Sequence, residues 1–283
     1  MNLCDYNDIR ELLGRHGFHF SKSMGQNFLI DPQVPYDIAA ASRADGSCGV
    51  LEIGPGIGPL TAELAQRAGK VVSVELDKSL LPVLAETMAP YPNVEIVPGD
   101  VMKLDLDALV RERFAGLRPI VCANLPYNIT TPVLTKLIET PCFETVTVLI
   151  QREVARRLCA PQGSSDGGSF SLFLQYHMET ELLFDVPPEK FLPAPKVTSS
   201  VIRCVRRQRP AVETADEAWF FKVVRGAFLL RRKTLSNSLA AALGMGKENV
   251  QAAIAACGFA PSVRGEQLTL EDFARLAEAL KTA

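Results

Sequence analysis

The chain has 283 residues, of which 47% are hydrophobic and 22% are charged, an ordinary composition for a globular protein. Its 30 basic and 32 acidic residues nearly balance, so the overall charge indicates neither an acidic nor a basic partner. Seven scattered cysteines without a C-x-x-C pair argue against a disulfide framework and a structural zinc site. Because neither a signal-peptide core nor a membrane-spanning apolar run is visible, we expect a cytoplasmic protein that involves no membrane and no metal.

From about residue 49, short apolar runs rich in valine and isoleucine alternate with longer segments of helical spacing. The predicted strands are 50–53, 71–76, 94–97, 120–125 and 146–150, and the predicted helices between them are 59–68, 78–88, 105–114 and 131–138. This alternation predicts an α/β fold with a doubly wound, mostly parallel sheet. Residues 179–186 and 197–206 are candidates to complete a seven-stranded sheet at its far edge.

The pattern changes at residues 206–216, which are polar, contain Pro210 and have no apolar period, so they are typical of a linker. Only helical patterns follow, at 217–230, 234–243, 247–257 and 270–280. We therefore predict an α/β domain at residues 1–205 and a small all-helical C-terminal domain at residues 206–283.

The segment 51-LEIGPGIGPLT-61 follows a predicted strand and opens a predicted helix, as a nucleotide-binding loop requires. Gly54, Gly56 and Gly58 let the backbone turn sharply and approach a ligand closely. A dinucleotide fingerprint has its third glycine one position later, where this chain has Pro59, a residue suited to the first turn of a helix. The spacing favours another cofactor, with an NAD-type loop and a plain strand–helix turn as alternatives.

Three acidic residues stand at the carboxyl ends of successive predicted strands. Glu52 would repel a pyrophosphate but suits an ammonium group. Glu75, about 20 residues after the first glycine, can bind both ribose hydroxyls, and Asp100 can accept a hydrogen bond from an adenine amino group. S-adenosylmethionine carries an ammonium and a sulfonium but no phosphate, so it is the predicted cofactor. The plainer interpretation of Asp100 is a helix cap.

The fourth predicted strand ends in Asn124-Leu125-Pro126-Tyr127, at the same edge as the acids. An exocyclic aromatic amine is a poor nucleophile, and two accepted N–H bonds localise its lone pair. The side-chain oxygen of Asn124 and the carbonyl of Leu125 can supply these acceptors, and Pro126 stiffens the turn. Tyr127 can stack on the base, which must be unpaired or flipped out. Alone, the quartet would be interpreted as a turn followed by a boundary aromatic.

Several longer motifs extend these observations over about residues 20 to 280. They are 25-GQNFL-29, 52-EIGPGIGPLT-61, 75-ELD-77, 124-NLPYNITTP-132, 151-QREVARRL-158, 191-FLPAPKVTSSV-201 and 228-FLLRRKTLSNSL-239. Through these motifs the chain resembles the small-subunit ribosomal RNA adenine N6-dimethyltransferase family. The resemblance implies a Rossmann-like methyltransferase sheet, and S-adenosylmethionine-dependent dimethylation of two adjacent adenines in the hairpin loop near the 3′ end of 16S rRNA.

The resemblance also implies roles for residues that the strand-end argument does not reach. Asn27 and Leu29 would cover the methionine end of the cofactor, and Phe191 would be a second aromatic wall opposite Tyr127. The complete set of predicted cofactor contacts is Gln26, Asn27, Leu29, Glu52, Gly54, Gly56, Gly58, Glu75, Leu76, Asp100, Val101 and Asn124. The predicted catalytic set is Asn124, Leu125, Pro126, Tyr127 and Phe191.

Basic residues cluster in two parts of the chain in spite of the balanced total charge. Those predicted to contact RNA are Arg152, Arg156, Lys196, Arg231, Arg232 and Lys233. Such runs are usually solvated faces, but beside a base pocket phosphate contacts are the better interpretation. The partner that the resemblance implies is 16S rRNA in an assembling small ribosomal subunit, bound by a monomer.

Two alternative functions stay open at this point. A sister methyltransferase acting on large-subunit rRNA would share the cofactor edge and an Asn-x-Pro-Tyr quartet. A ribosome-assembly factor would use the same surface mainly for binding, with catalysis secondary. The segments 191–201 and 231–239 favour the small-subunit enzyme.

Overall fold

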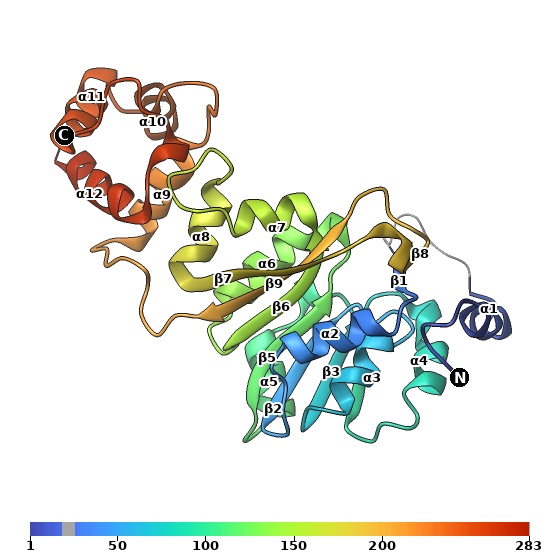
Figure 1. Ribbon diagram of the computed structural model, residues 1–283. Helices are drawn as coiled ribbons and strands as arrows, with labels where there is room; N and C mark the ends of the chain where they lie inside the picture. Colours follow the sequence, from blue (N-terminus) through green and yellow to red (C-terminus); the bar gives the residue numbers. More distant parts are fainter. Residues whose placement is uncertain (19–25, 283) are drawn as a thin grey trace. The chain divides into compact units, whose positions relative to one another are not determined.

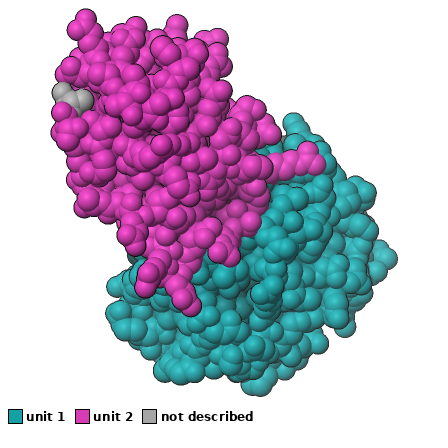
Figure 2. Space-filling model, turned by 60° about the vertical axis from the view of Figure 1, so that its left-hand side comes forward, with its two compact units in different colours: residues 1–155, 181–206 teal, residues 156–180, 207–283 magenta. Residues whose placement is uncertain are grey.

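The computed structural model describes residues 1–18 and 26–282 (Figure 1). It divides into two compact units, residues 1–155 with 181–206 and residues 156–180 with 207–283 (Figure 2). The strands are β1 (Phe28–Leu29), β2 (Cys48–Ile53), β3 (Lys70–Glu75), β4 (Val94–Pro98), β5 (Arg118–Asn124), β6 (Thr145–Gln151), β7 (Met178–Val186), β8 (Phe191–Leu192) and β9 (Ser199–Arg206). The helices are α1 (Tyr6–Arg15), α2 (Gln33–Ala41), α3 (Pro59–Ala65), α4 (Leu81–Thr87), α5 (Leu106–Arg113), α6 (Thr130–Glu139), α7 (Arg152–Leu158), α8 (Ser169–His177), α9 (Glu217–Ala227), α10 (Leu235–Leu243), α11 (Lys247–Ala256) and α12 (Leu270–Lys281).

Seven strands form one sheet in the order β4-β3-β2-β5-β6-β9-β7. The pairs β4–β3, β3–β2, β2–β5 and β5–β6 are parallel, whereas β9 runs antiparallel to β6. The predicted seven-stranded, mostly parallel sheet is therefore confirmed. Strand β9, the last one in the sequence, lies between β6 and β7, so that β7 forms the edge of the sheet.

The central strand β2 is buried on both faces, as its apolar composition predicts. Cys48 and Val50 belong to the core that α2 and α3 cover. The residue between them, Gly49, points to the opposite face, where an added Cβ would come within 2.4 Å of the Phe114 ring at the end of α5. The sheet is thus enclosed between helices, with α2 and α3 on one side (Figure 1).

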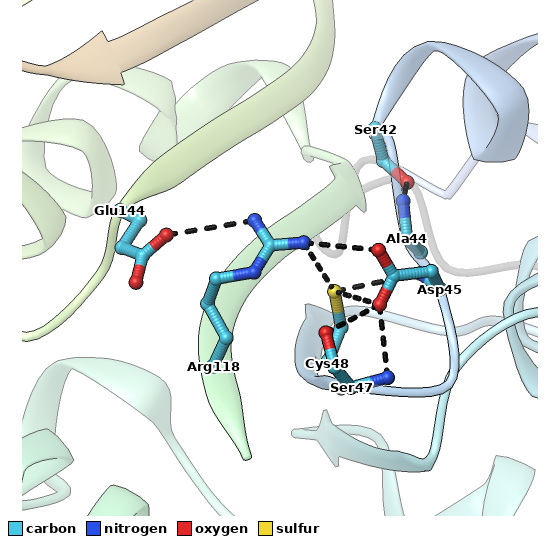
Figure 3. Close-up of polar contacts among 7 residues, drawn as sticks. All are labelled: Ser42, Ala44, Asp45, Ser47, Cys48, Arg118 and Glu144. Carbon is cyan, nitrogen blue, oxygen red and sulfur yellow. Dashed lines mark hydrogen bonds and ion pairs between the residues drawn. The ribbon is translucent and has the colours of Figure 1, made fainter.

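At the edge where β2 and β5 begin, polar groups satisfy one another; we call this the amino edge. The Arg118 guanidinium contacts Asp45 Oδ2 at 3.3 Å, Glu144 Oε2 at 3.5 Å and Cys48 Sγ at 3.0 Å (Figure 3). Asp45 Oδ1 also accepts from the backbone N–H of Ser47 at 2.8 Å. One guanidinium therefore ties together the starts of two strands and the turn before a third.

Two short strands were not predicted from the sequence. β1 pairs antiparallel with β8, with Phe28 opposite Leu192 and Leu29 opposite Phe191. Two residues are too few to show a period of two, and the pairing joins segments far apart in the chain. The motif 25-GQNFL-29 contains β1, but its first residue, Gly25, lies outside the described residues.

The second unit has its own core, in which α8 packs with the C-terminal helices. Tyr176 of α8 contacts Phe220 and Phe221 of α9, with ring centroids 5.4 and 4.9 Å apart. The four helices predicted after residue 216 are confirmed, although α9 ends at Ala227 and residues 228–233 form a turn. The assignment of a cofactor domain to residues 1–205 and an RNA-contacting domain to residues 206–283 stays a prediction.

Candidate functional site

The strands β2, β3 and β5 end beside a cavity of about 190 Å³ in the first unit; we call this side of the sheet the carboxyl edge. The cavity lining brings together most of the residues that the sequence predicts for the site. These are Gln26, Asn27, Leu29, Glu52, Gly54, Gly56, Glu75, Leu76, Asp100, Val101, Asn124, Leu125, Pro126 and Tyr127. Such a location is where open α/β sheets bind ligands.

The glycine loop between β2 and α3 forms one wall of this cavity. Gly54, Gly56 and Gly58 all have positive φ, at 70°, 63° and 95°. At Gly58 a Cβ would lie 2.4 Å from Met88 Cε, so the Met88 side chain would have to shift, in addition to the backbone strain. The Gly58 N–H donates to the Pro55 carbonyl at 3.0 Å, and Gly58 is not among the described residues that line the cavity. Pro59 occupies the first turn of α3, as predicted.

Glu52 is a carboxylate held almost entirely inside the protein, with 1% of its surface exposed. The hydroxyls of Thr61 and Ser73 both donate to its Oε2, each at 2.6 Å. Burial raises the pKa of Glu52 to about 7, although these two hydrogen bonds act in the opposite direction. One oxygen is therefore fixed by hydroxyls on α3 and β3, while the residue itself lines the cavity.

Glu75 ends β3 and is also buried, with 6% exposure. Its oxygens accept from the backbone N–H groups of Asp77, at 2.8 Å, and Gly56, at 3.4 Å. Burial raises the pKa of Glu75, and the nearby Asp77 carboxylate acts in the same direction. The glycine loop thus holds the carboxylate by a main-chain contact that needs no particular side chain.

Asp100 follows β4 and serves as the cap that the plainer interpretation predicted. Its Oδ1 accepts from the Met102 backbone N–H at 3.0 Å, at the start of a 3₁₀ turn that includes Val101. The residue nevertheless lines the cavity. The two interpretations are therefore compatible, because capping fixes the carboxylate at the cavity wall.

Among the described residues, three of the four lining carboxylates have no cation beside them, whereas Asp100 lies 3.9 Å from Lys103 Nζ. Within residues 1–18 and 26–282, no lysine or arginine forms an ion pair with Glu52, Glu75 or Asp77. Burial raises the pKa values of Glu52 and Glu75, because no neighbouring cation in the described part of the chain offsets the cost of burying their charge. A ligand that carries positive charge would supply this missing partner and favour the ionised carboxylates.

The quartet at the end of β5 lies beside the glycine loop, where a Cβ added at Gly54 would be 3.8 Å from the Pro126 ring. Asn124 Nδ2 donates to the backbone carbonyl of Asn27 at 3.2 Å, so its Oδ1 is the atom left to accept a further hydrogen bond. Leu125 is buried and its N–H donates to Leu149 on β6 at 3.1 Å. Pro126 turns the chain out of the strand, and its carbonyl accepts from the Thr130 hydroxyl at 3.2 Å.

Tyr127 lines the cavity and is held in place at its hydroxyl. This hydroxyl lies 2.6 Å from the Ser199 hydroxyl at the start of β9. Burial raises the pKa of the phenol, with the Ser199 hydrogen bond acting against this rise. Ser199 is a site residue that the sequence argument missed, because nothing local links it to a position 72 residues earlier.

Phe191 differs from the other predicted site residues in its surroundings. Only 2% of it is exposed, and it packs in the core with Leu29 and Val201. It is not among the described residues that line the cavity, but it lies directly opposite Leu29 in the β1–β8 pair. In this structure the ring therefore supports a cavity residue from behind.

Other lining residues were not predicted, although two carried a signal. Asp77 follows β3 and caps the 3₁₀ turn Lys78–Leu80, and Asn128 follows the quartet. Asp77 accepts from Gln26 Nε2 at 2.7 Å, which joins the segment before β1 to the end of β3. The position of Asp77 after a buried strand, and that of Asn128 beside the quartet, are the sequence signals that could have identified these two residues.

The predicted RNA contacts are all on exposed side chains, in both units. Arg152 and Arg156 lie on α7, Lys196 lies between β8 and β9, and Arg231, Arg232 and Lys233 lie in the turn between α9 and α10. Arg152 is 3.7 Å from Asp185, whereas the structured part of the chain pairs none of the other five with a carboxylate. Arg231 donates to the Ser165 carbonyl at 3.1 Å.

Two absences concern the described residues alone. None of their helices is long and apolar enough to span a bilayer. No cluster of three or more His, Cys, Asp or Glu side chains among them is arranged to hold a metal ion.

Comparison with known proteins gives consistent results over the whole chain. The family described as "Ribosomal RNA adenine dimethylase" matches residues 17–282. The "Ribosomal RNA small subunit methyltransferase A" of Geobacillus thermodenitrificans is 47% identical, covering 96% of this chain and 94% of that protein. The protein of the same name from Streptococcus sanguinis is 45% identical, with 100% and 99% coverage.

Solved structures agree with this fold. The 23S rRNA methyltransferase ErmE is 29% identical and superimposes with a TM-score of 0.71, covering 90% of this chain and all of that one. A dimethyladenosine transferase from Plasmodium falciparum has a TM-score of 0.72 at 24% identity, covering 90% of this chain and 97% of that one. The sheet, the cavity at its carboxyl edge and the match over residues 17–282 lead to one conclusion: the chain belongs to the ribosomal RNA adenine dimethylase family.

Proposed function

We propose that this protein transfers methyl groups from S-adenosylmethionine to the N6 amines of two adjacent adenines in the 3′-terminal hairpin loop of 16S rRNA. The observation that carries the proposal is a cavity that is lined by buried carboxylates without a cation among the described residues and lies next to Asn124-Leu125-Pro126-Tyr127. A cationic methyl donor fits beside the carboxylates, and an aromatic amine that accepts the methyl group fits beside the quartet. The relatives named as small-subunit methyltransferases support the choice of 16S rRNA.

The residues present fit the cofactor. S-adenosylmethionine supplies an electrophilic methyl group on a sulfonium, along with an ammonium, a ribose and an adenine. Glu52 would attract the ammonium, Glu75 would accept from the ribose hydroxyls, and Asp100 would accept from the adenine amine. The other proposed contacts are Gln26, Asn27, Leu29, Gly54, Gly56, Leu76, Val101 and Asn124, with Gly58 supporting the loop.

The acceptor side of the site would be prepared by the quartet. Asn124 Oδ1 is oriented as an acceptor because its amide nitrogen is bound to the Asn27 carbonyl. With the Leu125 carbonyl as second acceptor, the target amine would be held by both of its N–H groups. This preorganises the nitrogen lone pair, and the proton released after transfer can leave to water, so no strong base is needed.

Tyr127 would stack on the target base, with its ring kept in place by Ser199. Phe191 is proposed as the opposite wall. Since it is buried in this structure, its ring has to turn out of the core when a base enters. The target adenine must be unpaired, because a duplex hides its amine.

Exposed basic side chains would contact phosphates of the RNA. The side chains that we propose for this role are those of Arg152, Arg156, Lys196, Arg231, Arg232 and Lys233. We further propose that the enzyme is a monomer, that it acts on an assembling small subunit and that it is located in the cytoplasm. The rRNA substrate itself follows from the family.

The test uses purified full-length protein, immature small subunits and labelled S-adenosylmethionine. We expect label at the 3′ end of 16S rRNA, located by mass spectrometry, and much slower labelling with an Asn124→Ala protein. Label in large-subunit rRNA would instead favour the activity that the ErmE name describes. Subunit binding without any label, beside an active relative as positive control, would favour an assembly factor and contradict the proposed enzyme.

A further inference from the structure

Residues 26–31, which we call the strap, cross the cavity from one strand end to another. At one end, Gln26 Nε2 donates to Asp77 Oδ2 at 2.7 Å, after β3. In the middle, the Asn27 carbonyl accepts from Asn124 Nδ2 at 3.2 Å, after β5. Phe28 and Leu29 then line the cavity. The strap therefore joins the acidic side of the site to the quartet.

The other end of the strap is attached to residues 190–192. Leu29 pairs with Phe191 and Phe28 with Leu192, and the Ile30 N–H donates to the Lys190 carbonyl at 2.9 Å. Beyond these main-chain contacts, Lys190 Nζ donates to Asp31 Oδ2. Four successive links thus connect the two segments side by side.

The ion pair is the one side-chain link in this attachment that carries charge, and the main-chain part is short. A two-stranded ribbon of two residue pairs is marginal by itself. The ammonium of Lys190 lowers the pKa of Asp31, and the carboxylate raises that of Lys190, so both groups are charged at neutral pH. Asp31 Oδ1 also accepts from the Gln33 N–H at 2.9 Å, which fixes the carboxylate at the start of α2.

We propose that Asp31 and Lys190 are positioning residues, whose ion pair holds the strap against the cavity in the conformation that binds the cofactor. The inference rests on the proposed function, because it assigns the cavity to S-adenosylmethionine. Neither residue lines the cavity, so their effect on affinity passes through Asn27, Phe28 and Leu29. Preorganisation of a binding segment raises affinity by reducing the ordering that binding requires.

The chain offers a matched control for a merely structural ion pair. Lys70 Nζ lies 2.9 Å from Glu95 Oε2, and both side chains are 31% exposed, against 38% for Lys190 and 25% for Asp31. Lys70 begins β3, at the amino edge, and neither control residue lines the cavity. Lys190→Met and Lys70→Met thus remove the same charge from similarly exposed positions, although Glu95 keeps a second cation, because its Oε1 lies 3.3 Å from Arg113 Nε.

The test measures S-adenosylhomocysteine binding to the full-length protein by calorimetry, without RNA. We expect affinity to fall about three- to fivefold in Lys190→Met and in Asp31→Asn, the upper size of one exposed ion pair. Lys70→Met should bind within about twofold of the parent protein, and Lys190→Arg, which can still donate to Asp31, should restore binding. Unchanged binding in Lys190→Met, or an equal loss in Lys70→Met, would overturn the inference.

A second measurement keeps the test decisive if a variant is unstable. Hydrogen exchange at the Ile30 amide, which donates to Lys190, should become faster in Lys190→Met relative to the β2 amides, and stay unchanged in Lys70→Met. Because calorimetry reads ligand binding, its outcome is separate from the proposed reaction. If these variants behave as expected but no rRNA is methylated, the strap inference stands and the proposed substrate fails.

Discussion

The pKa values of carboxyl groups are shifted in opposite directions at the two edges of the sheet. At the amino edge, Asp45 lies beside Arg118, and hydrogen bonds from Ser47, with this guanidinium, lower its pKa. At the carboxyl edge, Glu52 is buried without a cation, and its pKa is raised to about 7. The amino edge satisfies its charges internally and so contributes stability, whereas the carboxyl edge leaves acidic groups in a cavity without a cation, within the described residues, to balance them. Unbalanced charge inside a folded protein is therefore a sign of a ligand.

The largest effect on methyl transfer should come from removing the hydrogen-bond acceptor Asn124 Oδ1 at the carboxyl edge. Asn124→Ala leaves the target amine without its side-chain acceptor, and we expect the single-turnover rate of methyl transfer to fall about 10²–10³-fold, as for loss of one preorganised polar group. Asn128→Ala is the matched control, because it removes an exposed amide from the lining of the same cavity. A rate within tenfold of the parent protein for Asn124→Ala would contradict the assigned role.

The next effect concerns the sign of the pH dependence of stability. The folded pKa of Glu52, about 7, lies above its ordinary value of 4.5, so the folded protein holds a proton that the unfolded chain releases between these values. The parent protein should therefore lose stability relative to Glu52→Gln as pH rises from about 4.5 to 7. The change in the free energy of unfolding is on the order of 3 kcal/mol, measured by urea titration at several pH values.

Asp45→Asn provides the contrast from the amino edge. The folded pKa of Asp45 is below its ordinary value of 3.8, so its contribution is present above that value and is lost as pH falls through the folded pKa. Between pH 5 and 8, the stability difference between parent and variant should stay constant. A slope of the same sign for both variants would show that the two edges do not differ as described.

A smaller effect on methyl transfer is expected from the hydrogen bond that joins Tyr127, at the carboxyl edge, to Ser199 on β9. Ser199→Ala removes the partner of the Tyr127 hydroxyl, and we expect methyl transfer to slow about five- to tenfold as the ring becomes less fixed. Tyr127→Phe, which removes the other half of the same hydrogen bond, should have a similar effect. S-adenosylhomocysteine binding should be unchanged in both, and a loss of binding would place the hydroxyl pair in the cofactor site instead.

The smallest effect should come from the amino edge. Arg118→Met removes two ion pairs whose arginine is about one-third exposed, and we expect it to lower the free energy of unfolding by about 1 kcal/mol. Methyl transfer per folded molecule should equal that of the parent protein. Thermal unfolding and single-turnover assays on the same preparation check both statements.

The sequence predicted what local patterns encode. The strands from β2 to β6 follow from apolar runs, and Glu52, Glu75 and Asp100 follow from the rule that parallel strands end at one edge. Pro59 was predicted at the start of α3 for a similarly local reason, its fixed backbone angle. The order of the strands along the chain and the acidic residues of the site can thus be predicted from short segments of sequence.

The remainder depends on contacts between distant segments. Nothing near Ser199 indicates that it will meet Tyr127, and the two-residue strands β1 and β8 are too short to show a pattern. The raised pKa of Glu52 likewise depends on its burial in the folded core. Phe191 came from the family resemblance alone, and the structure shows it supporting Leu29 from the core, a position that sequence spacing does not reveal.

The long span of the strap contacts has a consequence for protein synthesis. Asp31 and Lys190 are 159 residues apart, and Tyr127 and Ser199 are 72 apart. At about 5–20 residues per second, a ribosome needs several seconds to extend the nascent chain from the quartet to residues 190–199. During that interval β2 to β5 can already pair and the strap can meet Asp77 and Asn124, but residues 190–192, to which its other end attaches, are not yet made. A new copy therefore acquires its cofactor site in two stages, and the second waits for translation.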